Sequence, residues 1–236
     1  MQAKASTLLV LATRNRHKAG EIRTILGENY QYRTLEDFPG APGVVEDALT
    51  FGGNAAKKAM ELARWLAAGI SNLKFEISNP AFVLADDSGL EVDVLDGAPG
   101  VHSARFAFLD AGLRHGNAPD DANNAKLLRL LHDVPPGRRS ARFRCVIALA
   151  PILPSEPHNA SPVCSADELE FKVQLHEGVC EGQIAFEPKG RGGFGYDPLF
   201  VPEGFDASFA ELGEDVKNRI SHRSKSLQAL KAGLMT

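Results

Sequence analysis

Two groups of charged side chains in this sequence could act on an anionic substrate. The first is a basic loop that follows the first apolar run and contains Arg14, Arg16, His17 and Lys18. A helical pattern begins there, and the unpaired N–H groups and positive dipole end of a helix N-terminus favour a bound anion. Cations at a helix start are unfavourable unless an anion binds, so a phosphate-binding loop competes with a solvated surface as the explanation. The loop lacks the GxxxxGK[ST] pattern of a P-loop.

The second group is acidic. Asp86 and Asp87 follow the apolar run at 82–85, while Glu46 and Asp47 precede a helical pattern that contains Lys58. Ligands usually bind at strand ends in open α/β sheets, and adjacent carboxylates gain from a cation, for which hard oxygen ligands select Mg²⁺ or Mn²⁺. The run at 86–89 is Asp-Asp-Ser-Gly, which is also typical of a simple turn. We therefore predict a strand end here, and the turn and the metal site stay open together.

A glycine-rich segment at 190–195 matches GxGxxG. A dinucleotide fingerprint opens a helix after a strand, whereas here Tyr196, Asp197 and an apolar run follow, so we reject a Rossmann site. The glycines would let the backbone curl around a ligand, with Phe194 or Tyr196 offering a flat face and Asp197 an acceptor. A hairpin connection beside a core aromatic residue explains the same pattern.

A second basic cluster precedes the last helical pattern of the chain. Its members are Lys217, Arg219, His222, Arg223 and Lys225. Alone, such a cluster is most simply a solvated surface. Two basic and two acidic segments in one chain instead suggest a ligand that is a metal-bound polyphosphate.

The elements that must position these groups alternate as in an α/β domain. Strands are expected at 8–12, 82–85, 90–94, 143–150 and 169–175, with an apolar run at 184–186. Helices are expected at 19–26 with Gly27 as C-cap, from Asn54 to Gly69 and from Asp120 to Leu131, and a last helical pattern includes Leu227, Leu230 and Leu234. The segments 72–80, 110–119 and 151–162 look like surface excursions. We expect one compact unit over 1–236, with two lobes around a cleft.

Composition excludes several classes of protein. Lys+Arg number 26 and Asp+Glu 30, so the formal net charge is −4 and there is no global positive field for a nucleic-acid polymer. No stretch approaches the roughly 20 apolar residues of a membrane span. The three cysteines, Cys145, Cys164 and Cys180, show neither CxxC nor CxxH spacing, which argues against a disulfide framework or a zinc site. A cytoplasmic protein is expected.

Several motifs together resemble the inosine triphosphate pyrophosphatases, a family also called dITP/XTP or non-canonical purine NTP pyrophosphatases. They are, in order, LATxNxxK at 11–18, LTF with NA at 49–55, ADDSGL at 85–90, GAPG with SAR at 97–105, GGFGYDP at 192–198 and SHR at 221–223. The resemblance implies an α/β fold with an elongated mixed central sheet flanked by helices, and two lobes around a nucleotide-binding cleft. It also implies a homodimer and Mg²⁺-dependent hydrolysis of ITP, dITP and XTP to the monophosphate and pyrophosphate, with Mn²⁺ as a substitute metal.

The resemblance also assigns roles to residues. Glu46 and Asp87 would bind Mg²⁺, and Asp87 would orient or deprotonate the attacking water with support from Asp86 and from the charge of Lys18. The triphosphate would be held by Thr13, Asn15, Lys18 and Lys58, and Ser88 would touch the substrate. Phe194 would stack on the purine within the loop that contains Gly195 and Tyr196. The base and its surroundings would be read by Asp197, Lys217, His222 and Arg223.

Two departures from the family pattern matter. Arg14 stands where the family commonly has Gly, so the loop is either strained or shaped differently, or the guanidinium contacts phosphate. Gly53 replaces an acidic residue that is often found before Asn54. Two alternatives remain: a Maf-like pyrimidine nucleotide pyrophosphatase and a nucleotide-binding sensor without turnover.

Overall fold

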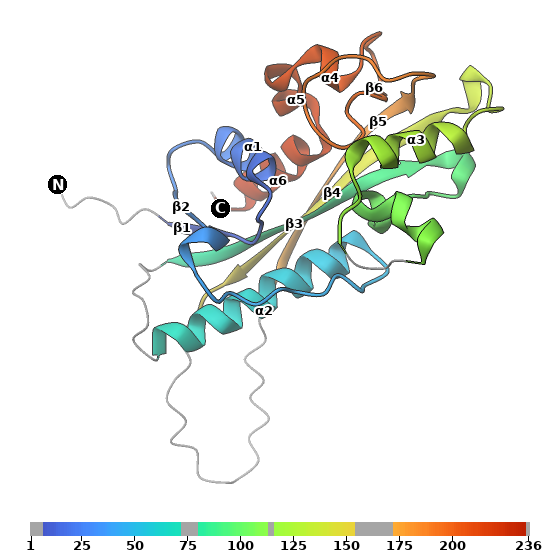
Figure 1. Cartoon of the computed structure of the whole chain (residues 1–236). Helices are drawn as coiled ribbons and strands as arrows, with labels where there is room; N and C mark the ends of the chain where they lie inside the picture. Colours follow the sequence, from blue (N-terminus) through green and yellow to red (C-terminus); the bar gives the residue numbers. More distant parts are fainter. Residues whose placement is uncertain (1–6, 72–79, 113–115, 154–171, 235–236) are drawn as a thin grey trace. The chain divides into compact units, whose positions relative to one another are not determined.

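The computed structural model describes residues 7–71, 80–112, 116–153 and 172–234. Its framework is a six-stranded mixed sheet of order β2-β1-β3-β4-β5-β6 (Figure 1). The strands are β1 (Leu8–Leu11), β2 (Gln31–Thr34), β3 (Ala81–Val92), β4 (Ser140–Pro151), β5 (Gln174–Ile184) and β6 (Phe200–Pro202). Strand β1 pairs in parallel with β2 and β3, and β5 pairs antiparallel with β6. The predicted α/β class with a mixed sheet flanked by helices is confirmed.

Helices connect and cover these strands. The α-helices are α1 (Arg16–Leu26), α2 (Phe51–Ser71), α3 (Asp120–Leu130), α4 (Phe209–Leu212), α5 (Glu214–Ile220) and α6 (His222–Leu234). The 3₁₀ helices are η1 (Leu35–Asp37), η2 (Asp93–Leu95), η3 (Gly100–Ala111) and η4 (Pro136–Arg138). By its contacts the chain divides into two compact units. The first contains Met1–Ala48, Gly52–Asp86 and Ile147–Leu175, and the second contains Leu49–Phe51, Asp87–Val146 and His176–Thr236.

The first unit follows from short sequence patterns. All four residues of β1 are buried, which suits a continuous apolar run in a parallel strand with both faces covered. Helix α1 begins at the N-cap Asn15 and ends at Gly27, whose N–H donates to Arg23 O. The buried side of α2 carries Ala55, Ala59, Leu62, Ala63 and Leu66, the residues that predicted it.

The second unit is built on one apolar cluster. Leu90 and Val92 of β3, Phe143 of β4 and Leu127 of α3 belong to it, together with Phe200. The rings of Phe143 and Phe200 have centroids 4.6 Å apart. Because side chains alternate along a strand, Phe143 is buried while its neighbours Arg142 and Arg144 are only partly buried.

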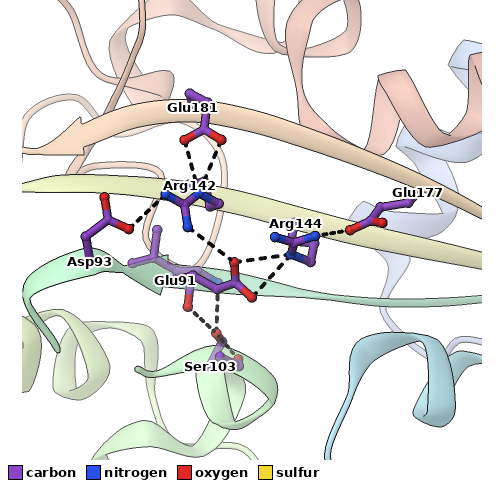
Figure 2. Close-up of polar contacts among 9 residues, drawn as sticks. Glu91, Asp93, Ser103, Arg142, Arg144, Glu177 and Glu181 are labelled. Atoms are coloured by element: carbon purple, nitrogen blue, oxygen red, sulfur yellow. Dashed lines mark hydrogen bonds and ion pairs between the residues drawn. The ribbon is translucent and has the colours of Figure 1, made fainter. Parts of the chain in front are cut away.

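The arginines of β4 join three strands of the second unit (Figure 2). Arg144 Nε lies 3.2 Å from Glu91 Oε2 on β3, and the guanidinium also pairs with Glu177 on β5. Arg142 Nε lies 3.1 Å from Glu181 Oε2 on β5, and its Nη2 lies 2.8 Å from Asp93 Oδ1 in η2. These cross-strand pairs favour one register of β3, β4 and β5.

One prediction about β3 was wrong. The Asp-Asp-Ser-Gly run at 86–89 is not a turn, because β3 continues through it from Ala81 to Val92. Turn propensity is local, whereas β3 lies between β1 and β4 in the sheet, and pairing with neighbours overrides such preferences. The strand expected at 90–94 is therefore the second half of β3, and Val94 lies in η2.

Other predicted boundaries shifted. Helix α2 begins at Phe51, before the predicted Asn54, and continues past Gly69, so Lys57 and Lys58 lie in its second turn. Strand β5 begins at Gln174 and includes Ile184, whereas 169–171 lie outside the described residues. Of the predicted excursions, 72–79, 113–115 and 154–162 also lie outside them, and residues up to Ala111 belong to η3.

Candidate functional site

In the first unit, the predicted phosphate loop is organised by Asn15. Its Oδ1 accepts hydrogen bonds from His17 N and Lys18 N at 2.9 and 3.2 Å, and Thr13 Oγ1 accepts one from Asn15 N at 3.1 Å. No acidic residue lies in the first turn of α1. A helix N-terminus with cations and without carboxylates in its first turn suits an anion.

Lys18 and Lys58 converge on Asp86 from different helices of this unit. Lys18 Nζ forms an ion pair with the carboxylate of Asp86. Lys58 Nζ donates to Asp86 O at 2.6 Å and lies 3.3 Å from Glu46 Oε1. The structure therefore brings both lysines together with two of the predicted acidic residues, Asp86 and Glu46.

The Arg14 departure does not strain the loop. Among the described residues, Asp96 is the only non-glycine residue with a positive φ, so the Arg14 backbone lies in an ordinary region. The Arg14 side chain is exposed, and its Nη2 lies 3.5 Å from Ala41 O. The other departure, Gly53, lies inside the first turn of α2.

In the second unit, a buried ion pair lies beside the predicted aromatic platform. Lys217 Nζ of α5 lies 2.6 Å from Asp197 Oδ2, and their side chains are 4% and 2% exposed. The same carboxylate oxygen accepts from Phe194 N at 2.9 Å. A Cβ on Gly193 would lie 2.1 Å from Asp197 Oδ2, so only glycine allows this close approach.

Two cations border the ring of Phe194. Lys217 Nζ lies 4.3 Å from its centroid and Arg223 Cζ lies 5.9 Å away, within the range of cation–π interactions. Arg223 Nη2 also donates to Ser88 Oγ at 2.9 Å. Ser88 directly follows Asp87, which is 6% exposed. Arg223 thus connects the aromatic platform with the acidic segment of β3.

His222 and Tyr196 both contact the apolar core. The His222 ring stacks on Phe143 with centroids 4.7 Å apart and is 4% exposed as a residue. Tyr196 is equally buried, its hydroxyl donates to Ser103 O at 2.9 Å, and burial raises the pKa of that hydroxyl. Of the two aromatic residues predicted to offer a flat face, Phe194 is the one beside cations.

Sequence analysis missed the residues that hold the loop around Gly195. Asp120 and Asn124 of α3 bond its backbone N–H and C=O, at 2.7 and 3.0 Å respectively. Asp120 was noted only as a helix start. The one signal was their spacing, since residues four apart share a helix face.

Among the described residues, no cluster of three or more His, Cys, Asp and Glu side chains could hold a metal ion. Mg²⁺ does not need such a cluster, because it usually binds only one or two protein carboxylates and completes its shell with phosphates and water. No helix in the described part of the chain is long and apolar enough to span a membrane. Cys145 and Cys180 are buried thiols that are not joined in a disulfide, and Cys164 lies outside the described residues.

Comparison with known proteins adds an independent finding. The model of the Ham1 family matches residues 9–233. A dITP/XTP pyrophosphatase of Desulforamulus reducens is 46% identical over 222 residues, covering 93% of this chain and 92% of that protein. One from Geobacter sulfurreducens is 46% identical over 226 residues, covering 95% of each. The solved structure of the Staphylococcus aureus Ham1 protein has a TM-score of 0.72 and 31% identity, covering 97% of this chain and 98% of that one.

Proposed function

The chain belongs to the Ham1 family, and on that premise we propose that it hydrolyses non-canonical purine nucleoside triphosphates such as ITP, dITP and XTP. The products are the nucleoside monophosphate and pyrophosphate, so the enzyme removes these nucleotides from the pool. The observation that carries the proposal is the arrangement around Phe194. An aromatic ring bordered by Lys217 and Arg223 suits a purine with an electron-rich carbonyl.

We assign binding of the triphosphate to the two lysines beside Asp86. Lys18 and Lys58 supply positive charge, and the N–H groups at the start of α1 supply donors for phosphate oxygens. Attack at the α-phosphorus builds negative charge on the equatorial and leaving oxygens, which these cations stabilise. A bound triphosphate would also explain why cations gather at the start of α1, where no acidic residue lies in the first turn.

We assign water activation to Asp87 and support of it to Asp86. The water oxygen forms a bond to the α-phosphorus, its proton passes to the Asp87 carboxylate, and the bond to the bridging oxygen breaks to release pyrophosphate. We assign Glu46 and Asp87 as the residues that would hold Mg²⁺, because carboxylate oxygens are the ligands it prefers and few protein ligands suffice when phosphates complete the shell. When bound, Mg²⁺ would neutralise phosphate charge and orient the triphosphate.

We assign selectivity to His222 and to Arg223, which borders the Phe194 ring. His222 and Arg223 would donate to a 6-oxo group, whereas the 6-amino group of adenine would leave a donor unsatisfied. Each mismatch costs on the order of 1–3 kcal/mol, so one or two of them give about ten- to several-thousand-fold discrimination against ATP. Asp197 and Lys217 act mainly on each other and on Phe194, and we assign them to holding the platform.

A nucleotide panel with and without Mg²⁺ tests the reaction, metal and base class together. Pyrophosphate should be released from ITP and XTP far faster than from ATP or GTP, and only with the metal. Equal rates on all purines would remove the selectivity claim, and faster hydrolysis of modified UTP would favour a Maf-like pyrimidine enzyme. Binding of ITP without any turnover would instead indicate a sensor.

Asp87→Asn tests the mechanism. It should lower kcat by about a hundredfold or more while nucleotide binding stays measurable, because the amide keeps the size of the side chain but cannot take up the proton of the water. Asp93→Asn is the matched control, since that carboxylate pairs with Arg142 in the second unit and has no assigned catalytic role. Near-normal turnover in Asp87→Asn would exclude this residue as the base. A homodimer, and a cytoplasmic protein that binds no nucleic-acid polymer and no membrane, remain predictions from the sequence.

A further inference from the structure

Helix α3 holds the backbone of Gly195 at both of its polar groups. Gly195 N donates to Asp120 Oδ2 at 2.7 Å, and Gly195 O accepts from Asn124 Nδ2 at 3.0 Å. Gly195 has φ +64°, a left-handed conformation that favours glycine. The two side chains are four residues apart, so they lie on one face of α3.

The rest of α3 is fixed by other contacts, so the helix is a rigid support. Asn123 Oδ1 accepts from Ala107 N at 2.8 Å, and Lys126 Nζ donates to Phe106 O at 2.8 Å. Both partners belong to η3, and Leu127 lies in the apolar core. Asp120 and Asn124 therefore connect a fixed helix to the loop that carries Phe194.

The amide of Asn124 has a feature that a purely structural role does not explain. Asn124 is 8% exposed, and within the described part of the chain its Oδ1 is buried without a hydrogen-bond partner. An unsatisfied buried acceptor costs stability, so retaining this amide needs a compensating use. The nitrogen of the same amide, Asn124 Nδ2, donates the hydrogen bond to Gly195 O.

We propose that Asp120 and Asn124 are positioning residues for base recognition, which fix the Phe194 platform by clamping Gly195. The proposal rests on the function proposed above, because it assigns a role within that same site. Phe194 is then held from two directions. Asp197 accepts a hydrogen bond from the N–H of Phe194, and α3 binds the N–H and C=O groups of the next residue, Gly195.

The clamp makes a distinct prediction for kinetics. A platform that moves stacks less well on the bound base but leaves water activation at Asp87 intact. Asp120→Ala and Asn124→Ala should therefore raise the KM for ITP about tenfold and change kcat by less than about threefold, as expected when uniform binding is lost. The preference for ITP over ATP should fall, because a loose platform no longer holds the base against His222 and Arg223.

Matched controls are available on the same helix. Asp121→Ala removes a neighbouring carboxylate from the same first turn, and Asn123→Ala removes a buried amide that bonds η3 instead of the loop. Asn123→Ala should lower the melting temperature without raising the KM. Asp120→Asn keeps an acceptor oxygen for Gly195 N and should restore most of the KM, which a general loss of stability would not do.

Hydrogen exchange of a peptide covering 193–198 separates this proposal from the proposed function. Exchange should rise in Asp120→Ala and Asn124→Ala and stay at the wild-type level in Asp121→Ala. If the wild-type protein hydrolyses no nucleotide, the proposed function fails, and hydrogen exchange still tests the clamp. Unchanged exchange and unchanged KM in Asp120→Ala, an exposed position that tolerates alanine, would overturn the proposal.

Discussion

The buried pair Lys217–Asp197 allows a quantitative test of how the base platform is held. In Lys217→Met the Asp197 carboxylate would stay buried, with a side chain 2% exposed, and would lose an ammonium partner at 2.6 Å. Breaking a buried ion pair from one side costs about 3–5 kcal/mol, since an uncompensated charge remains. For a chain of this size that corresponds to a fall in Tm of about 6–20 °C.

Removing both charges should be less harmful than the two single changes suggest. Asp197→Asn leaves the ammonium without its carboxylate, whereas the double variant Lys217→Met/Asp197→Asn leaves no buried charge at this position. The amide of Asn can also still accept from Phe194 N. The sum of the two single costs in unfolding free energy should therefore exceed the cost of the double variant by a coupling energy of about 2–3 kcal/mol.

The assay is a double-mutant cycle by urea and thermal unfolding. The exposed pair Lys57–Asp47 has the same residue types and a similar Nζ–Oδ1 distance of 2.7 Å, but its side chains are 32% and 65% exposed. Its variants Lys57→Met and Asp47→Asn should leave Tm essentially unchanged, because water screens an exposed pair. Additive costs at Lys217 and Asp197, or equal effects at both pairs, would refute the reasoning.

Three further predictions concern stability, alkaline pH and thiol reactivity. Arg139→Met should cost about 3–5 kcal/mol in urea unfolding, since the buried guanidinium donates to backbone carbonyls, Ile184 O and Leu131 O among them. Arg144→Met should cost about 1 kcal/mol or less, because its ion pairs are partly exposed, and equal costs would contradict this. Burial raises the pKa of Tyr32 from 10.0 to about 12, so folding favours its neutral form. The resulting contribution to the free energy of unfolding is complete below pH 10 and is lost as the pH rises to about 12. The free energy of unfolding of Tyr32→Phe should therefore fall less steeply over this range than that of the wild type, and an identical pH profile would contradict the prediction. Burial raises the pKa of Cys180 to about 11, so a Cys164→Ser variant should react with Ellman's reagent at pH 8 only after unfolding, and rapid labelling of the native protein would disprove this.

Much of the fold was predictable because its signals are local. The apolar run of β1, the C-cap at Gly27, the start of α3 at Asp120 and the alternation along β4 each depend on residues close in sequence. The candidate site was predictable in residue type for a similar reason. A helix start rich in cations and a pair of adjacent carboxylates are unusual without a ligand.

The errors arose where distant pairing decides the structure. Asp86 to Gly89 have the composition of a turn, yet β3 continues through them because neighbouring strands supply its hydrogen bonds. The start of α2 was placed three residues too late because Gly52 and Gly53, which are poor helix formers, lie in its first turn.

The sequence by itself determined the residue types of the site, its charge pattern, the α/β class and the order of the motifs. Only the tertiary structure decided which of these residues meet. Lys18 pairs with Asp86 at a separation of 68 residues, Asp120 holds Gly195 at 75, and Arg223 bonds Ser88 at 135. Such contacts leave no periodic trace, because they depend on how strands and helices pack, and packing is a property of the whole chain.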